Sequence, residues 1–163
     1  MINPDSSKIN QMSLVVFTLD DGHYALKLDA VNRIIQSVEI TVLPTAPDAI
    51  LGVINFRGNI TPVFNIRKRF HLPEKDNDPD NRLIIAHTKT RNMALPVDMV
   101  LDVIETPQET VTSADALFPA IDHVSGVLKM ASGLVVIYDF NGFLSLEEEK
   151  NLDSALNKIE GIK

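Results

Sequence analysis

The sequence has 163 residues, no cysteine and a formal net charge of −7. The lack of cysteine excludes disulfides, thiolate metal sites and thiol nucleophiles, and the negative charge opposes binding to nucleic acid and to anionic lipid. Hydrophobic residues make up 45% of the chain and charged residues 23%, which is typical of a globular domain. The N-terminus lacks a secretory signal and no stretch reaches the roughly 18 apolar residues of a membrane span. We therefore expect a cytoplasmic protein without direct membrane insertion.

The first part of the chain has the pattern of short β-strands. Residues 14–19 form a largely apolar run rich in β-formers, and apolar and polar residues alternate at 24–28. The turn between them predicts a β-hairpin. Asp29 predicts a cap for a short helical turn, and residues 34–42 return to strand character. Residues 50–56 and 60–66 predict a second hairpin, in which Pro62 indicates an edge or bulged position because proline donates no ladder hydrogen bond.

The second half of the chain, which follows a predicted loop at residues 71–81, repeats the first half. Residues 24–35 align without a gap with residues 93–104, and residues 52–66 align with residues 126–140. Self-similarity in the same order implies two copies of one supersecondary plan. Many short strands separated by glycine and proline favour closed or nearly closed barrels, so we predict a mainly β fold of two related subdomains.

The end of the chain predicts an amphipathic helix. Ser145 and Glu148 have the spacing of a capping box. The apolar residues that follow lie near one face of a helix: Leu146, Leu152, Ala155, Leu156 and Ile159. We expect this helix to dock on a barrel with its acidic residues facing water.

The sequence predicts no catalytic residues, no metal site and no cofactor. The four histidines, at positions 23, 71, 87 and 123, include no pair at the spacing of two helical ligands, and His123 near Asp122 and Ser125 matches no nucleophile motif. Asp76, Asp78 and Asp80 imitate the start of a calcium loop, but asparagine and histidine stand where that loop requires glycine and glutamate. We therefore expect the protein to act by binding other molecules through its surface.

Charged residues that differ between the two copies are candidates for a surface role. Arg57 aligns with Ala131, and Arg33 aligns with Asp102, so the shared backbone plan demands neither arginine. Arg57 also lies close in sequence to a basic run, residues 67–69. This cluster leaves open the binding of an acidic ligand, although the net charge argues against nucleic acid.

The run GVINFRGNITPVFNIRKRF at residues 52–70 resembles the signature of the CheW-like family. The resemblance extends from about Ser13 to the C-terminus. It implies two SH3-like β-barrel subdomains with short helical turns and a C-terminal helix. The domains expected are an N-terminal tail at residues 1–12, a CheW-like domain of two interleaved subdomains at residues 13–145, and a helix at residues 146–163.

The function that the resemblance implies is scaffolding without chemistry. Proteins of this family bind the regulatory domain of a CheA-type histidine kinase and the cytoplasmic tip of chemoreceptors, and are monomeric until they join arrays. In the family, receptor binding maps to a groove between subdomains. Carried over by motif, the receptor-binding residues would be Val31, Arg33, Gly52 and Arg57.

Two positions depart from the family pattern. Arg33 stands where a glutamate commonly pairs with the motif arginine, and Asn65 replaces the usual aspartate. The first departure leaves open a CheW-like scaffold of a different kinase array, such as one that controls pili or surface behaviour. A module that binds an acidic ligand is the remaining alternative.

Overall fold

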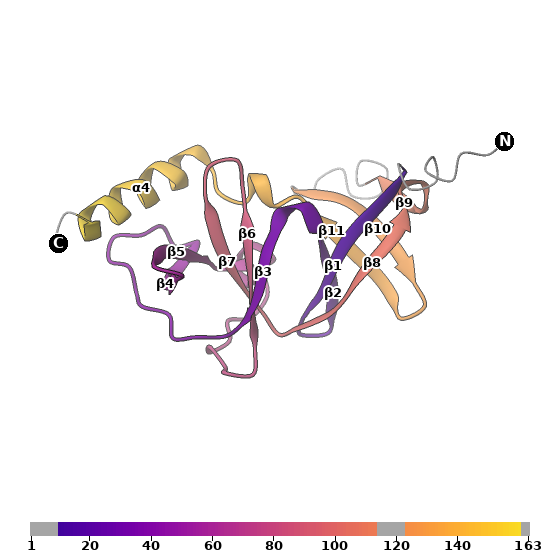
Figure 1. Ribbon diagram of the computed structural model, residues 1–163, viewed down its shortest axis with the longest axis horizontal. Coiled ribbons are helices and arrows are strands. Elements are labelled where there is room, and N and C mark those ends of the chain that lie inside the picture. Colours follow the sequence, from indigo (N-terminus) through magenta and orange to yellow (C-terminus); the bar gives the residue numbers. More distant parts are fainter. Residues whose placement is uncertain (1–9, 114–122, 161–163) are drawn as a thin grey trace. The chain divides into compact units, whose positions relative to one another are not determined.

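The computed structural model describes residues 10–113 and 123–160 (Figure 1). Most of the predicted N-terminal tail, and Asp122 beside His123, lie outside the described residues. The chain divides into two compact units. Unit 1 comprises Met1–Val31 and Asp98–Phe140, and unit 2 comprises Asn32–Val97 and Asn141–Lys163. No helix within the described ranges is long and apolar enough to span a membrane.

Unit 1 contains a six-stranded sheet with the order β8-β1-β2-β11-β10-β9. Its elements are β1 (Gln11–Leu19), β2 (Gly22–Lys27), the 3-10 turn η1 (Leu28–Ala30), β8 (Met99–Pro107), the 3-10 turn η2 (Gln108–Thr110), β9 (Val111–Ser113), β10 (Val124–Met130) and β11 (Gly133–Tyr138). The 3-10 turn η3 (Phe140–Gly142) begins in unit 1 and ends in unit 2. All pairings are antiparallel except β2 with β11, which is parallel. The core lies around Leu14, Val16 and Ile137.

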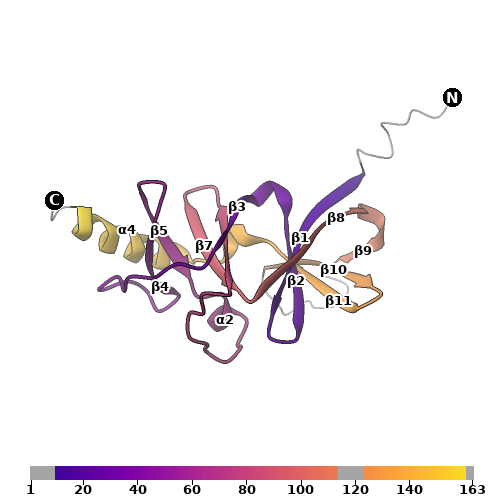
Figure 2. The same cartoon turned by 60° about the horizontal axis from the view of Figure 1, so that its bottom comes forward.

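Unit 2 contains a five-stranded sheet with the order β3-β6-β7-β5-β4. Its elements are β3 (Val31–Gln36), whose first residue falls on the unit boundary, β4 (Ile50–Phe56), β5 (Asn59–Phe64), α2 (Ile66–Arg69), β6 (Arg82–His87), β7 (Asn92–Val97) and α4 (Leu146–Glu160). Its core lies around Ile54, Val63 and Ile85. Figure 2 shows β4 and β5 as a hairpin within this unit.

The two sheets repeat one plan. The bounds of β4 and β5 coincide with those of β10 and β11 in the sequence alignment, and β2 and β11 pair in parallel as β7 and β5 do. Thr41 bridges Val53 at the edge of unit 2, where β9 pairs with β10 in unit 1. The predicted mainly β fold with duplicated hairpins is confirmed.

The prediction for Pro62 was wrong. β5 lies between β7 and β4, so Pro62 is in an interior strand and not at an edge. The register shift in this hairpin falls between Ile50 and Gly52 of the partner strand. The pairing of β5 with β7 is registered at one position, Val63 with Ala94. A ladder this short leaves room for a proline that donates no hydrogen bond.

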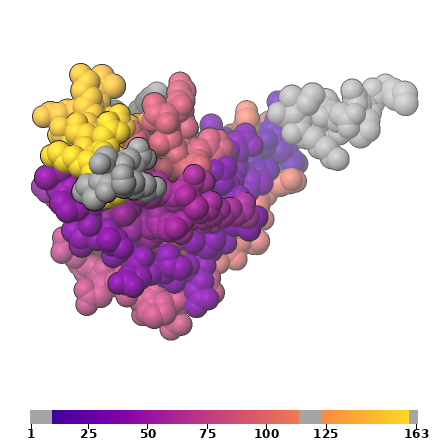
Figure 3. Space-filling model, turned by 60° about the vertical axis from the view of Figure 1, so that its left-hand side comes forward, coloured from indigo at the N-terminus to yellow at the C-terminus, as the bar shows by residue number. Residues whose placement is uncertain are grey.

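The C-terminal helix begins as predicted, but its contacts differ from the expectation. The Ser145 N–H donates to Glu148 Oε1 (3.0 Å) and the Glu148 N–H donates to Ser145 Oγ (3.1 Å), which is a capping box. Leu152 and Ala155 are buried, whereas Leu146 is 83% exposed. Figure 3 shows α4, in yellow, on the surface of unit 2.

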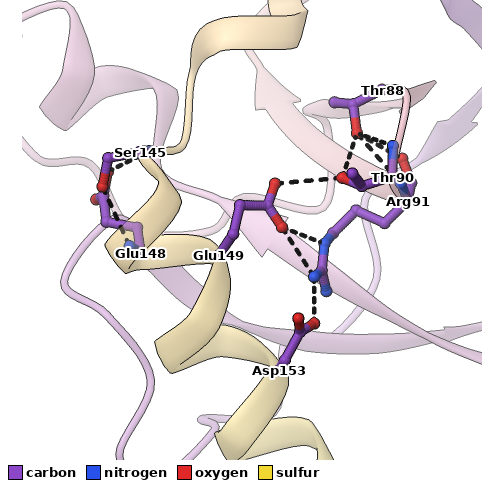
Figure 4. Close-up of polar contacts among 7 residues, drawn as sticks. All are labelled: Thr88, Thr90, Arg91, Ser145, Glu148, Glu149 and Asp153. Atoms are coloured by element: carbon purple, nitrogen blue, oxygen red, sulfur yellow. Dashed lines mark hydrogen bonds and ion pairs between the residues drawn. The ribbon is translucent and has the colours of Figure 1, made fainter.

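The acidic start of α4 does not simply face water. Glu148 accepts two hydrogen bonds from Arg69 of α2, at 3.0 and 3.1 Å. Glu149 and Asp153 both bind Arg91 in the loop between β6 and β7, and the Thr90 hydroxyl donates to Glu149 (Figure 4). These carboxylates therefore attach α4 to α2 and to the loop between β6 and β7 within unit 2.

Candidate functional site

Arg57 occupies the tip of the hairpin between β4 and β5. Phe56 pairs with Asn59, so Arg57 and Gly58 form a two-residue turn. Their φ angles are 52° and 81°, which identifies the type I′ turn that matches the twist of two strands. The Arg57 side chain is exposed, and its guanidinium lies 5.2 Å from the centre of the Phe56 ring.

The backbone of Arg57 adopts a conformation that arginine disfavours. The first position of a type I′ turn favours asparagine, aspartate or glycine, because other residues pay a steric cost at positive φ. Gly58 at the second position adopts positive φ without steric cost, because it has no side chain. Its N–H donates a hydrogen bond to Asn55 Oδ1 (2.9 Å). The turn therefore gives no reason of its own for an arginine at position 57.

Gly52 is explained by contacts within unit 2. A Cβ atom built on Gly52 would lie 2.2 Å from the Thr41 backbone oxygen. Thr41 and Val53 exchange two backbone hydrogen bonds, at 2.9 and 2.8 Å, which bring this segment against β4. Gly126 has the same role in unit 1, where a Cβ would lie 2.5 Å from a Val111 methyl carbon. The space beside Gly52 is thus filled by the chain itself, which favours a structural role for this residue.

Val31 and Arg33 lie at the start of β3. Val31 is half-buried and is the last residue of unit 1, and its N–H donates to the Leu28 carbonyl. Arg33 belongs to unit 2 and is exposed on β3, at one end of the sheet order. Among the described residues, neither Arg33 nor Arg57 forms an ion pair. Of the four predicted receptor-binding residues, the structure places Arg33, Gly52 and Arg57 in one unit.

The basic run at residues 67–69 is largely used inside unit 2. Arg67 is buried and donates to the Pro73 carbonyl at 3.2 Å. Arg69 binds Glu148 and lies 5.5 Å from the centre of the Phe64 ring. Lys68 is half-exposed and lies 3.6 Å from Asp48. Two of the three cations thus hold the fold together, which weakens the alternative of an acidic ligand.

Asn65 keeps a role that aspartate would also perform. It is the N-cap of α2, and its Oδ1 accepts a hydrogen bond from the Lys68 N–H at 3.1 Å. Asparagine and aspartate cap helices about equally well. The departure from the family pattern at this position therefore leaves the local structure intact.

Two groups in the described part of the chain have shifted pKa values, and structural contacts explain both. Burial, and after it the neighbouring Tyr24, raises the pKa of Tyr138 to about 12, so this phenol stays neutral. Burial opposes ionisation of Glu148, but hydrogen bonds from Ser145 and Arg69 outweigh it and lower the pKa of this carboxyl below its ordinary value. Within the same residues no three acidic or histidine side chains are placed to hold a metal ion.

The ion pairs of Arg91 were missed at the sequence level. Glu149 and Asp153 are one helical turn apart, so the spacing predicts that they share a face. The sequence does not show which cation this face meets, because Arg91 lies in a loop far away along the chain.

Comparison with known proteins identifies the family. Residues 13–148 match the CheW-like domain. The chain is 31% identical over 140 residues to the chemotaxis protein CheW of Bacillus subtilis, covering 85% of this chain and 90% of that protein. It is 26% identical over 148 residues to the chemotaxis protein CheW of Treponema pallidum, covering 87% of each.

A solved structure agrees with this assignment. The scaffolding protein TtCheW from Thermoanaerobacter tengcongensis superimposes with a TM-score of 0.75 at 29% identity, covering 84% of this chain and 94% of that one. The likeness confirms the predicted fold of SH3-like β subdomains. The duplicated sheets, the motif around Arg57 and these relatives lead to one conclusion: the chain belongs to the CheW-like domain family.

Proposed function

We propose that the protein is a non-catalytic chemotaxis adaptor that couples chemoreceptors to a CheA-type histidine kinase. The observation that carries this proposal is Arg57, an exposed cation at a turn position where the hairpin needs positive φ but has no need of an arginine. Residues in strained backbone conformations are concentrated at functional sites. The names of the relatives, chemotaxis protein CheW and scaffolding protein, support the same role.

Arg57 suits recognition of a carboxylate on a receptor. A guanidinium presents a fork of donors that can bind both oxygens of a carboxylate. The ring of Phe56 supports the side chain, which lowers the entropy lost when it is fixed by a partner. We propose that Val31 and Arg33 also contact the receptor.

The test is a pair of titrations followed by calorimetry. The purified protein is titrated with the regulatory domain of the CheA-type kinase from the same organism, and separately with a soluble fragment of a chemoreceptor tip. We expect saturable one-to-one binding to the kinase domain. Arg57→Glu should weaken receptor binding at least tenfold, leaving kinase binding and the melting temperature nearly unchanged.

Arg57→Asn is the matched control for the backbone. Asparagine is favoured at this turn position, so the variant should fold at least as stably as the parent. Receptor binding should nevertheless fall, because the guanidinium is gone. Equal losses of receptor binding, kinase binding and stability would contradict the proposed role and indicate a structural one.

The alternative of a different kinase array rests on Arg33. Because the family commonly has a glutamate at this position, Arg33 changes the charge offered to the receptor. If the protein serves a different receptor, Arg33→Glu should improve binding to an ordinary chemoreceptor tip and weaken binding to its own. No change with either fragment would remove the support for this alternative.

A further inference from the structure

Three polar side chains join β3 to the hairpin of β6 and β7. The Asn32 Nδ2 donates a hydrogen bond to Asn92 Oδ1 (3.0 Å), and the Asn32 Oδ1 lies 3.1 Å from His87 Nδ1. His87 and Asn92 are the last opposite pair before the loop of that hairpin. One side chain of β3 therefore holds both strands of the hairpin through hydrogen bonds.

The chemistry of this cluster determines which ring nitrogen of His87 carries a proton. Because the Asn32 amide nitrogen is the donor to Asn92, the Asn32 amide oxygen is the acceptor that faces His87. An acceptor needs a donor opposite it, so His87 Nδ1 carries a hydrogen even in the neutral ring. The Nδ1–H form of His87 is thus a marker of the intact cluster.

The stability of the fold does not explain the cluster. Asn32, His87 and Asn92 are all exposed, so water competes for their hydrogen bonds and the net stabilisation is small. In the repeat, Asn32 aligns with Leu101, whose side chain has no hydrogen-bonding group. The plan shared by the two sheets therefore does not demand an asparagine at position 32.

Asn32 lies where β3 enters unit 2. The boundary between the units falls between Val31 and Asn32, and β3 is at one end of the sheet order. A terminal strand is restrained by a neighbour on one side only, so a side-chain contact at its start limits local opening. Arg33 is the next residue, is exposed and belongs to no ion pair within the described ranges. The Asn32 contacts thus restrain the backbone that carries Arg33.

We propose that Asn32 is a positioning residue that holds Arg33 ready for the receptor. This inference rests on the proposed function, in which Arg33 contacts the receptor. An arginine whose backbone is already restrained loses less conformational freedom on binding, so its affinity for the partner is higher. His87 and Asn92 are the groups against which Asn32 is fixed.

The first experiment is a double-mutant cycle on receptor affinity, measured by titration with the soluble chemoreceptor-tip fragment from the same organism. Asn32→Ala should weaken binding about fivefold in the parent and should have no effect in the Arg33→Ala variant, because Asn32 acts through Arg33. Kinase-domain binding should be unchanged in all variants. Equal losses from Asn32→Ala in the two backgrounds would overturn the positioning role.

Gln36 is the matched control on the same strand. It is exposed at the other end of β3, and its Nε2 donates to the Pro79 carbonyl at 3.3 Å. Gln36→Ala therefore removes a comparable hydrogen bond of β3 but leaves the cluster beside Arg33 intact. Receptor affinity should stay at the parent value. A loss as large as that of Asn32→Ala would mean that any loosening of β3 is sufficient, and would contradict a specific role of Asn32.

The second experiment follows the His87 ring by nitrogen NMR, with the signals assigned by comparison with His87→Gln. In the neutral ring of the parent we expect the Nδ1–H form, and Asn32→Ala should shift the ring towards the Nε2–H form. Gln36→Ala should leave the tautomer unchanged. The same tautomer in Asn32→Ala as in the parent would show that the cluster does not hold Asn32.

Arg33→Ala separates this inference from the proposed function. If the parent binds no receptor tip, both proposals fail. If Arg57→Glu weakens receptor binding but Arg33→Ala does not, the proposed function stands and only the positioning of Arg33 is wrong.

Discussion

At the scale of single residues, Asn65 shows how a departure from the family pattern is absorbed. Its Oδ1 satisfies the Lys68 N–H at the start of α2. Asn65→Ala leaves that donor without its cap and should lower the free energy of unfolding by about 1 kcal/mol. Asn65→Asp should be close to neutral. Urea denaturation measures both, and equal stability of the alanine variant and the parent would show that the cap is unimportant.

Gly52 gives a sharper prediction. A methyl group 2.2 Å from a backbone oxygen forces the Thr41 segment away from β4, so Gly52→Ala should destabilise the protein by about 3 kcal/mol. Gly58 is the control, because a Cβ there meets no atom and only the positive φ opposes it. Gly58→Ala should lower stability by about 1 kcal/mol. Similar midpoints of thermal unfolding for the two variants would contradict the steric explanation.

The sequence could predict some of these residues and not others. Comparing the two copies indicated that Gly52 follows the shared plan and that Arg57 does not, since Gly126 aligns with Gly52 and Ala131 with Arg57. The neighbour that fills the space at Gly52 could not be predicted, because strand character at residues 34–42 does not show that Thr41 pairs with Val53 of β4. The contact with Thr41 favours a structural role for Gly52, and its role in receptor binding stays a prediction.

At the scale of elements, α4 depends on ion pairs as well as on Leu152 and Ala155. The Arg91 side chain is only 14% exposed and meets two carboxylates of the helix. Arg91→Ala leaves these acids facing each other without a cation. The substitution should lower the free energy of unfolding by about 1 to 2 kcal/mol. Hydrogen exchange should then be faster in α4 than in β6. Lys150→Ala, on the exposed side of the helix, should change neither the free energy of unfolding nor the hydrogen exchange of α4.

Glu148 makes the attachment of α4 dependent on pH. Its pKa is lowered in the folded protein, so the stabilisation is present above the pKa of the unfolded chain, near 4.3, and is lost as the pH falls through the folded value. Glu148→Gln should therefore be less stable than the parent at pH 7. The two proteins should converge only once the pH has fallen below the lowered pKa of Glu148 in the folded protein. A difference that persists in acid would show that the charge of Glu148 is not its cause.

Elements with local signals were predictable from the sequence. The capping box of α4 and the turn at Gly58 each involve residues within a few positions of one another. The prediction that the acids of α4 face water was wrong for Glu148 and Glu149. Their partners are cations in α2 and in the β6–β7 loop, which lie far away along the chain. Leu146 fits the apolar pattern but precedes the part of the helix that is buried.

At the scale of the whole molecule, the two copies of the repeat are exchanged between the two units. β1 and β2 from the first half join the sheet of β8 to β11, whereas β3 to β5 join β6 and β7 from the second half. Neither half of the sequence therefore contains a complete sheet. Each sheet buries its core only when strands from both halves are present.

This exchange predicts how the protein responds to division. A chain cut within residues 71–81, between α2 and β6, yields two fragments that each lack strands of both sheets. Each fragment alone should show the circular dichroism and the narrow amide dispersion of an unfolded chain. Mixed at equal concentration, they should recover the spectrum of the intact protein, because the severed loop contributes no strand. A fragment that folds alone would show that one half carries a self-sufficient core and that the exchange of strands is not required for folding.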